Sequence, residues 1–105
     1  MQHPRDTDLH QTYCYSVRAG ADPSVLPRLL ELFAKRGMIP AAFHARRHDH
    51  AASPLQIDIE ASGLEQALAE YMQRCMRQIV GVELVLLSTK HTLQLRETGP
   101  VARAG

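Results

Sequence analysis

The chain has 105 residues, of which 45% are apolar, 22% charged and 5% aromatic, and its formal net charge is +1. A chain of this size supports one domain with a single hydrophobic core. The near-zero charge excludes a bulk electrostatic attraction to nucleic acid or to an anionic membrane. No run of about 20 apolar residues and no N-terminal signal peptide occurs, so the expected compartment is the cytoplasm. Two cysteines are too few for a disulfide framework.

The middle of the chain is expected to form one uninterrupted domain. We expect residues 1–11 to form a polar N-terminal lead, residues 12–88 the domain, and residues 89–105 a C-terminal tail. Residues 92–95 of this tail suit a short extra strand, whereas residues 99–105 show no hydrophobic periodicity. No linker, repeat or low-complexity run divides the domain.

Residues 12–19 alternate between two faces, which predicts a half-buried strand. The side chains on its core-facing side are Tyr13, Tyr15, Val17 and Ala19. A helix follows, with Ser24 as its N-cap and Gly37 at its C-terminal end. Pro27 falls at the third helical position, where its missing N–H costs no hydrogen bond. The apolar face of this helix consists of Val25, Leu26, Leu29, Leu30, Leu32 and Phe33.

Residues 39–48 alternate again and predict a second strand, with Ile39, Ala41, Phe43 and Ala45 sharing one face. Pro40 cannot donate to a neighbouring strand, so this strand is expected at a sheet edge. A turn through residues 49–52 leads to a third strand. Its inward-facing residues are Leu55, Ile57 and Ile59.

Ser62 and Glu65 form a capping box, S-x-x-E, which predicts that the second helix begins there. Apolar residues at helical spacing continue this helix to about residue 79. Gly81 is expected to end the segment. Residues 82–88 are apolar on both faces and predict a final strand, in which we expect Leu84 to face the helices.

The order strand, helix, strand, strand, helix, strand is that of the ferredoxin-like α+β fold, βαββαβ. Right-handed crossovers place both helices on one face of a four-stranded antiparallel sheet and leave the other face open. The residues expected on this open face are Cys14, Ser16, Arg18, His44, Arg46, His48, Gln56, Asp58, Val85 and Leu87. A mixed polar and apolar open face favours a symmetric partner, so we expect a homodimer.

The first helix carries a recognisable motif, R-x-x-x-L-F-x-x-R-G. The matching residues, with the leucine that precedes them, are Leu26, Arg28, Leu32, Phe33, Arg36 and Gly37. Over about residues 13–87 the chain resembles the ACT domains, and most of all the ACT domain of the acetolactate synthase small (regulatory) subunit. The likeness is strongest in residues 21–40 and 77–85. The resemblance implies a non-catalytic regulatory module of amino-acid metabolism.

The resemblance also implies that an amino acid or related effector binds where one protomer's first loop meets its partner's second strand. The residues expected to line this site are Gly20, Ala21, Asp22, Pro23, Ser24, Val25 and Leu26, with Met38, Ile39 and Pro40 from across the interface. Backbone amides of residues 24–26 would hold a carboxylate, and Asp22 would balance an ammonium group. Met38 and Ile39 would line an apolar pocket.

The sequence departs from the family pattern at three of these positions. Ala21 replaces the common Asp or Asn, Ser24 replaces Gly, and Ile39 replaces the Asn of valine-binding relatives. Neither Ala21 nor Ile39 can accept a hydrogen bond through its side chain. The alternative hypothesis is therefore an interaction module that has lost the effector. Such a module would dimerise or bind a biosynthetic enzyme subunit through its edge strands or open face.

Histidines cluster near the predicted turn. His44 and His48 are about 13 Å apart in an extended strand, too far for one metal ion. His48, Asp49 and His50 could approach one another, but a solvated turn is the simpler interpretation, and we predict no metal or cofactor.

The sequence contains no Ser/His/Asp ordering, no phosphate-binding glycine loop and no H-E-x-x-H motif, so we predict no enzymatic activity. Cys75 is expected in the core and Cys14 is expected to be structural rather than reactive. Arg18, Arg46 and Arg47 form a local basic spot on the open face or edge. No RNP-like motif accompanies them, so RNA binding is not expected.

Overall fold

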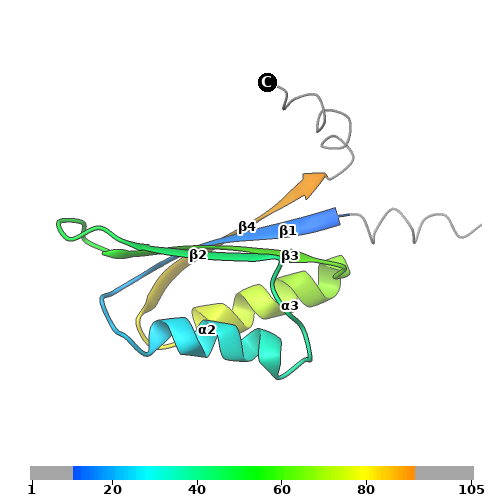
Figure 1. The fold of residues 1–105 in the computed structure, drawn as a ribbon, viewed down its shortest axis with the longest axis horizontal. Coiled ribbons are helices and arrows are strands. Elements are labelled where there is room, and N and C mark those ends of the chain that lie inside the picture. The colour runs from blue at the N-terminus through cyan, green and yellow to red at the C-terminus, as the bar shows by residue number, and fades with distance from the viewer. Residues whose placement is uncertain (1–10, 92–105) are drawn as a thin grey trace, which may run out of the picture.

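A computed structural model describes residues 11–91 of the chain. The elements follow one another in the predicted order βαββαβ (Figure 1). They are β1 (Gln11–Ala19), α2 (Val25–Ala34), β2 (Ala42–Arg47), β3 (Leu55–Ser62), α3 (Gln66–Arg77) and β4 (Val82–His91). The predicted strand over residues 92–95 lies outside the described residues. The ferredoxin-like fold is confirmed.

The four strands form one antiparallel sheet in the order β2-β3-β1-β4. Both helices lie against the same face of this sheet and leave the other face open (Figure 1). β2 forms one edge of the sheet, as predicted. It begins at Ala42, however, so Ile39 and Pro40 lie outside the strand that was expected over residues 39–48. β4 forms the other edge. Ile39 precedes β2 and is 91% exposed.

The core lies between the sheet and the helices. Its central side chains, all fully buried, include Tyr15, Val17, Val25, Leu29, Phe33, Ile57, Ile59, Met72, Met76 and Val85. The alternation predicted for β1 is confirmed, since Tyr13, Tyr15, Val17 and Ala19 are all buried in the core. The hydroxyl of Tyr15 donates to the carbonyl oxygen of Ala69 in α3 at 2.9 Å. Burial raises the pKa of this phenol.

The inward face of β4 was predicted wrongly. Val85 is buried and Leu87 packs against the core, whereas Leu84 and Leu86 are 43% and 56% exposed. A strand that is apolar on both faces has no alternation from which its orientation can be predicted. The register decides instead, because Val85 lies opposite the buried Val17 of β1.

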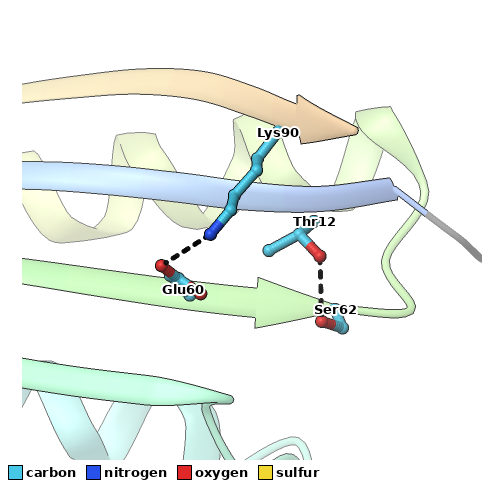
Figure 2. Close-up of polar contacts among 4 residues, drawn as sticks. All are labelled: Thr12, Glu60, Ser62 and Lys90. Carbon is cyan, nitrogen blue, oxygen red and sulfur yellow. Dashed lines mark hydrogen bonds and ion pairs between the residues drawn. The ribbon is translucent and has the colours of Figure 1, made fainter. Parts of the chain in front are cut away.

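The capping-box prediction at Ser62 was also wrong. Ser62 belongs to β3, where it pairs with Thr12 of β1, and the two hydroxyl oxygens lie 3.2 Å apart (Figure 2). α3 begins at Gln66, with the extended Glu65 as its N-cap. Strand pairing thus holds Ser62 extended, and the chain turns at Gly63, whose φ is +78°. The C-terminal end of α3 lies at Arg77 rather than near residue 79.

Candidate functional site

The loop that joins β1 to α2 is anchored to the turn before β4. The amide of Gly20 donates to the carbonyl oxygen of Gly81 at 2.9 Å. Gly81 has φ +101°, and a Cβ there would approach Val25 Cγ2 to 3.1 Å. A side chain at this position would therefore strain the backbone and press against the first turn of α2. These contacts hold the start of the loop, at the C-terminal end of β1, against the turn before β4.

Asp22 organises the interior of this loop. Its Oδ1 accepts hydrogen bonds from both the amide and the hydroxyl of Ser24, each at 2.9 Å. Its main-chain carbonyl accepts from the amide of Val25 at 3.1 Å. The two bonds from Ser24 hold the pKa of the Asp22 carboxyl below its ordinary value of 3.8. Asp22 is therefore a carboxylate at neutral pH.

These hydrogen bonds occupy main-chain amides that were predicted to bind the carboxylate of a ligand. Ser24 is the N-cap of α2 as predicted, but it makes no side-chain cap and its hydroxyl donates to Asp22 instead. Of the amides of residues 24–26, those of Ser24 and Val25 donate within the loop. A carboxylate could reach them only by displacing Asp22.

A cleft of about 200 Å³ lies beside the loop. Its lining residues are Ala21, Asp22, Pro23, Leu26, Arg47 and Leu55. The lining residues are mostly apolar and include one acidic residue, Asp22, and one basic residue, Arg47. Four of the predicted site residues thus come together, joined by one strand residue from β2 and one from β3.

Arg47 is the residue that sequence reasoning missed, since it was assigned to a basic spot with Arg18 and Arg46. In the sheet Arg47 lies opposite Leu55, and Arg46 lies opposite Gln56. Consecutive strand residues face opposite sides, so Arg47 points to the helix side and Arg46 to the open face. The predicted alternation of this strand already contained that signal. Arg47 forms an exposed ion pair with Asp49 at 2.8 Å.

The second half of the predicted site lies at the other end of α2. Met38 follows the helix and donates its amide to the carbonyl oxygen of Phe33 at 2.9 Å. A helix of ten residues spans about 15 Å, so residues 38–40 and the β1–α2 loop are well separated within one chain (Figure 1). Met38 packs against the core, whereas Ile39 projects into solvent. One copy alone does not unite the two halves.

His48 and His50 lie at the tip of the β2–β3 hairpin, whereas His44 lies within β2 opposite Asp58. The amide of His48 donates to the carbonyl oxygen of Pro54 at 2.7 Å, and Asp49 is engaged by Arg47. The hydroxyl of Ser53 donates to the Glu83 carboxylate at the start of β4. Between residues 11 and 91, no group of three or more His, Cys, Asp or Glu side chains is arranged to hold a metal ion.

On the open face, a chain of hydrogen bonds centres on Gln56. Arg18 Nε donates to Gln56 Oε1 at 3.2 Å. Gln56 Nε2 in turn donates to Ser16 Oγ at 3.1 Å and to Asp58 Oδ1 at 3.2 Å. Arg18 and Arg46 flank Gln56 on the neighbouring strands. The tyrosines of β1 are buried on the opposite side, so this face offers no β1 ring for base stacking.

Cys14 is half-buried on the same face and is a free thiol. Burial is the main cause that raises its pKa, and the Glu60 carboxylate adds to this effect. Lys90 acts in the opposite direction; it reaches across β1 to Glu60, with 3.4 Å between Nζ and Oε2 (Figure 2). A thiol with a raised pKa is a poor nucleophile, which favours a structural role for Cys14.

A comparison with protein-family profiles identifies the family of the chain. Residues 6–94 match the family profile described as an ACT-like domain. A search of curated proteins finds no match to the chain. Within the described part of the chain, no helix is both long enough and apolar enough to cross a membrane.

Proposed function

The chain belongs to the ACT-like domain family, and from this membership we propose that it is a non-catalytic regulatory module that senses an amino-acid-like effector as a homodimer. The observation that carries the proposal is the cleft beside the β1–α2 loop. It brings one acidic residue, Asp22, and one basic residue, Arg47, together among otherwise apolar residues.

An amino acid carries both charges and a side chain, and the cleft offers a partner for each. Arg47 can take the effector carboxylate through two parallel N–H donors, the role that the amides of residues 24–26 were expected to fill. Asp22 keeps acceptor capacity at Oδ2 for an ammonium group, because Ser24 occupies Oδ1. Leu26 and Leu55 offer contact to an apolar side chain. The exposed ion pair with Asp49 is weak enough for Arg47 to exchange partners.

We propose that residues 38–40 of the partner subunit complete the site. Two features support this arrangement. Ile39 is a large apolar side chain that is 91% exposed, as expected for a residue that a partner covers. It also leads into β2, whose outer edge has no strand beside it in the described sheet. Pairing of two β2 edges about a two-fold axis would bring the partner's Ile39 toward the first loop.

The resemblance of residues 21–40 and 77–85 to the acetolactate synthase small subunit supports a finer proposal. The partner of the module would be a biosynthetic enzyme subunit of amino-acid metabolism, and its compartment the cytoplasm. The alternative is an interaction module without an effector. Ala21 and Ile39, which lack side-chain acceptors for an ammonium group, favour that alternative.

A thermal-shift screen against the twenty amino acids tests the proposal. An effector present at 100 times its Kd stabilises the protein by about 2.7 kcal/mol, which raises the Tm by several degrees in a domain of this size. The shift should disappear in Arg47→Ala and persist in the matched control Arg46→Ala, whose side chain points to the other face. A flat screen, or a shift that survives Arg47→Ala, would contradict this site. Enzyme-subunit binding that is indifferent to Asp22 and Ser24 substitutions would support the alternative.

A further inference from the structure

The two helices carry more positive charge than the rest of the chain. Residues 25–37 and 66–78, which hold α2 and α3 with the turns that follow them, contain five cations and two carboxylates. These residues are Arg28, Lys35, Arg36, Arg74 and Arg77, with Glu31 and Glu70. All of them are exposed. The helix layer therefore has a net charge of +3, whereas the whole chain has +1.

A tyrosine of α3 gathers two of these cations. The guanidinium carbon of Arg36 lies 5.1 Å from the centroid of the Tyr71 ring, and that of Arg74 lies 5.7 Å from it. Both distances fall within the range of about 6 Å over which an aromatic ring attracts a cation. Arg36 also donates to the main-chain carbonyl oxygen of Leu32 at 3.5 Å. The ring thus holds two like charges close together on the surface.

No carboxylate neutralises this pair of arginines. Among residues 11–91, the ion pairs lie in the sheet and its hairpin, and none includes a helix residue. Glu70 stands four residues before Arg74, at the spacing of a helical ion pair. Its Oε2 instead accepts a hydrogen bond from the side-chain amide of Gln66 at 2.9 Å. Most guanidinium N–H donors of the pair are therefore left for an anion from outside the described chain.

The pair lies at one end of the boundary between α2 and α3. Arg28, Leu32 and Arg36 follow one another at intervals of four residues, so they share one side of the α2 segment. The contact of Arg36 with Tyr71 shows that this side faces α3, which lies beside α2 (Figure 1). Eight residues of helix span about 12 Å, so Arg28 lies that far along the boundary from Arg36.

We propose that this boundary docks an acidic, extended segment of a partner protein. Its carboxylates would pair with Arg36 and Arg74 at one end and with Arg28 at the other. Carboxylates four residues apart in an extended chain are about 13 Å apart, close to the spacing of these cations. Each guanidinium can take a carboxylate through two parallel N–H donors. Tyr71 is 44% exposed, and tyrosine and arginine are residue types that often dominate the binding energy of an interface.

The chemistry of the boundary favours an acidic peptide over other anions. A single ion gains little from an exposed cation, whereas several carboxylates on one chain bind together. Single-stranded nucleic acid uses aromatic rings for base stacking, but guanidinium groups already lie over Tyr71. The surface is also separate from the effector cleft, because α2 presents Leu26 to that cleft and the side with Arg36 to α3.

The first test is the fluorescence anisotropy of a fluorescein-labelled oligoglutamate peptide, which self-repulsion keeps extended, titrated with the full chain. We expect saturable binding that weakens as salt is added. R36E/R74E should weaken binding by more than about tenfold. R18E/R46E makes the same change of charge on the open face and should weaken it by less than about threefold. No binding to the wild type, or an equal loss in the two variants, would overturn the proposal.

The second test separates the ring from the charges. Tyr71→Leu removes no charge but should weaken binding by about threefold or more, because both guanidinium groups lose the ring that holds them. Wild-type affinity in this variant would overturn the role of the ring. Arg28→Ala should also weaken binding, and more than Arg77→Ala, which removes the same charge at a position outside the series that contacts Arg36. Equal effects of these two variants would overturn the placement along the boundary.

Two further outcomes distinguish this proposal from its neighbours. Tighter binding of an oligodeoxythymidine than of the peptide, lost in R36E/R74E, would overturn the choice of an acidic peptide as partner. The thermal response to an amino acid should persist in R36E/R74E, since Arg47 and Asp22 are unchanged. The docking surface and the effector site therefore fail separately. Circular dichroism of each variant confirms that a loss of binding is not a loss of fold.

Discussion

The side-chain amide of Gln73 on α3 donates a hydrogen bond of 3.0 Å to the main-chain carbonyl oxygen of Val85 on β4. β4 is an edge strand of the sheet. The side chain of Gln73 thus occupies a main-chain acceptor of an edge strand. Edge strands with unused main-chain groups are templates for pairing with other chains. This contact favours β2 over β4 as the edge available for intermolecular pairing.

Gln73→Ala should therefore have two effects. Loss of the hydrogen bond should lower the free energy of unfolding by about 0.5–1.5 kcal/mol. The freed carbonyl should also speed aggregation on mild heating, which light scattering can follow. Gln66→Ala is the control, because the Gln66 amide bonds only to the exposed side chain of Glu70 among the contacts of the described residues. Equal aggregation rates in the two variants would contradict a protective role for Gln73.

Tyr15→Phe should destabilise the domain by about 0.5–1.5 kcal/mol in urea unfolding, because it removes the bond to Ala69 from the buried core. The raised pKa of Tyr15 also makes the free energy of unfolding depend on pH. The buried phenol stays neutral above its ordinary pKa of 10.0 while the unfolded chain ionises, so wild-type stability should fall as pH rises above 10. Tyr15→Phe should lack this component. Tyr71→Phe, at an exposed position, should leave the stability within about 0.5 kcal/mol of wild type.

Gly81→Ala should lower the free energy of unfolding by about 1–3 kcal/mol, because φ is +101° there. The new Cβ would also approach Val25 Cγ2 to 3.1 Å. Gly20→Ala is the matched control at the other end of the same hydrogen bond. A Cβ at Gly20 meets its nearest neighbour, Glu83 Oε2, at an ordinary 3.9 Å. Equal stabilities for the two variants would show that the turn before β4 tolerates a side chain.

The Asp22 carboxyl should titrate below its ordinary value of 3.8 in an NMR experiment. A lowered folded-state pKa contributes stability that is present above the unfolded value and is lost as pH falls through the folded value. The stability difference between wild type and Asp22→Asn should therefore shrink as the pH drops below 3.8. Ser24→Ala, which removes one of the two donors, should move the pKa back toward 3.8. An Asp22 pKa at or above 3.8 in the wild type would contradict the loop geometry.

Some of the candidate site followed from the sequence and some did not. The loop residues Ala21, Asp22, Pro23 and Leu26 were predicted, and they do line one cleft. Arg47 was not placed there, although the alternation that begins at Phe43 puts it on the helix side of β2. The main-chain amides of residues 24–26 were predicted to bind the carboxylate of a ligand. The sequence did not show that the side chain of Asp22 already accepts a hydrogen bond from the amide of Ser24. Such a local contact depends on rotamers that spacing does not specify.

The sequence by itself determined the element order, and with it the fold, because local periodicity and turn residues are properties of short segments. The alternation in β1 determined which of its faces is buried. Only the tertiary structure decided the orientation of β4, since a strand apolar on both sides is oriented by its register with Val17. Strand pairing also explains why Ser62 is not the predicted N-cap, because its pairing with Thr12 outweighs the local helix signal. Long-range hydrogen bonds and burial decide wherever local signals are ambiguous.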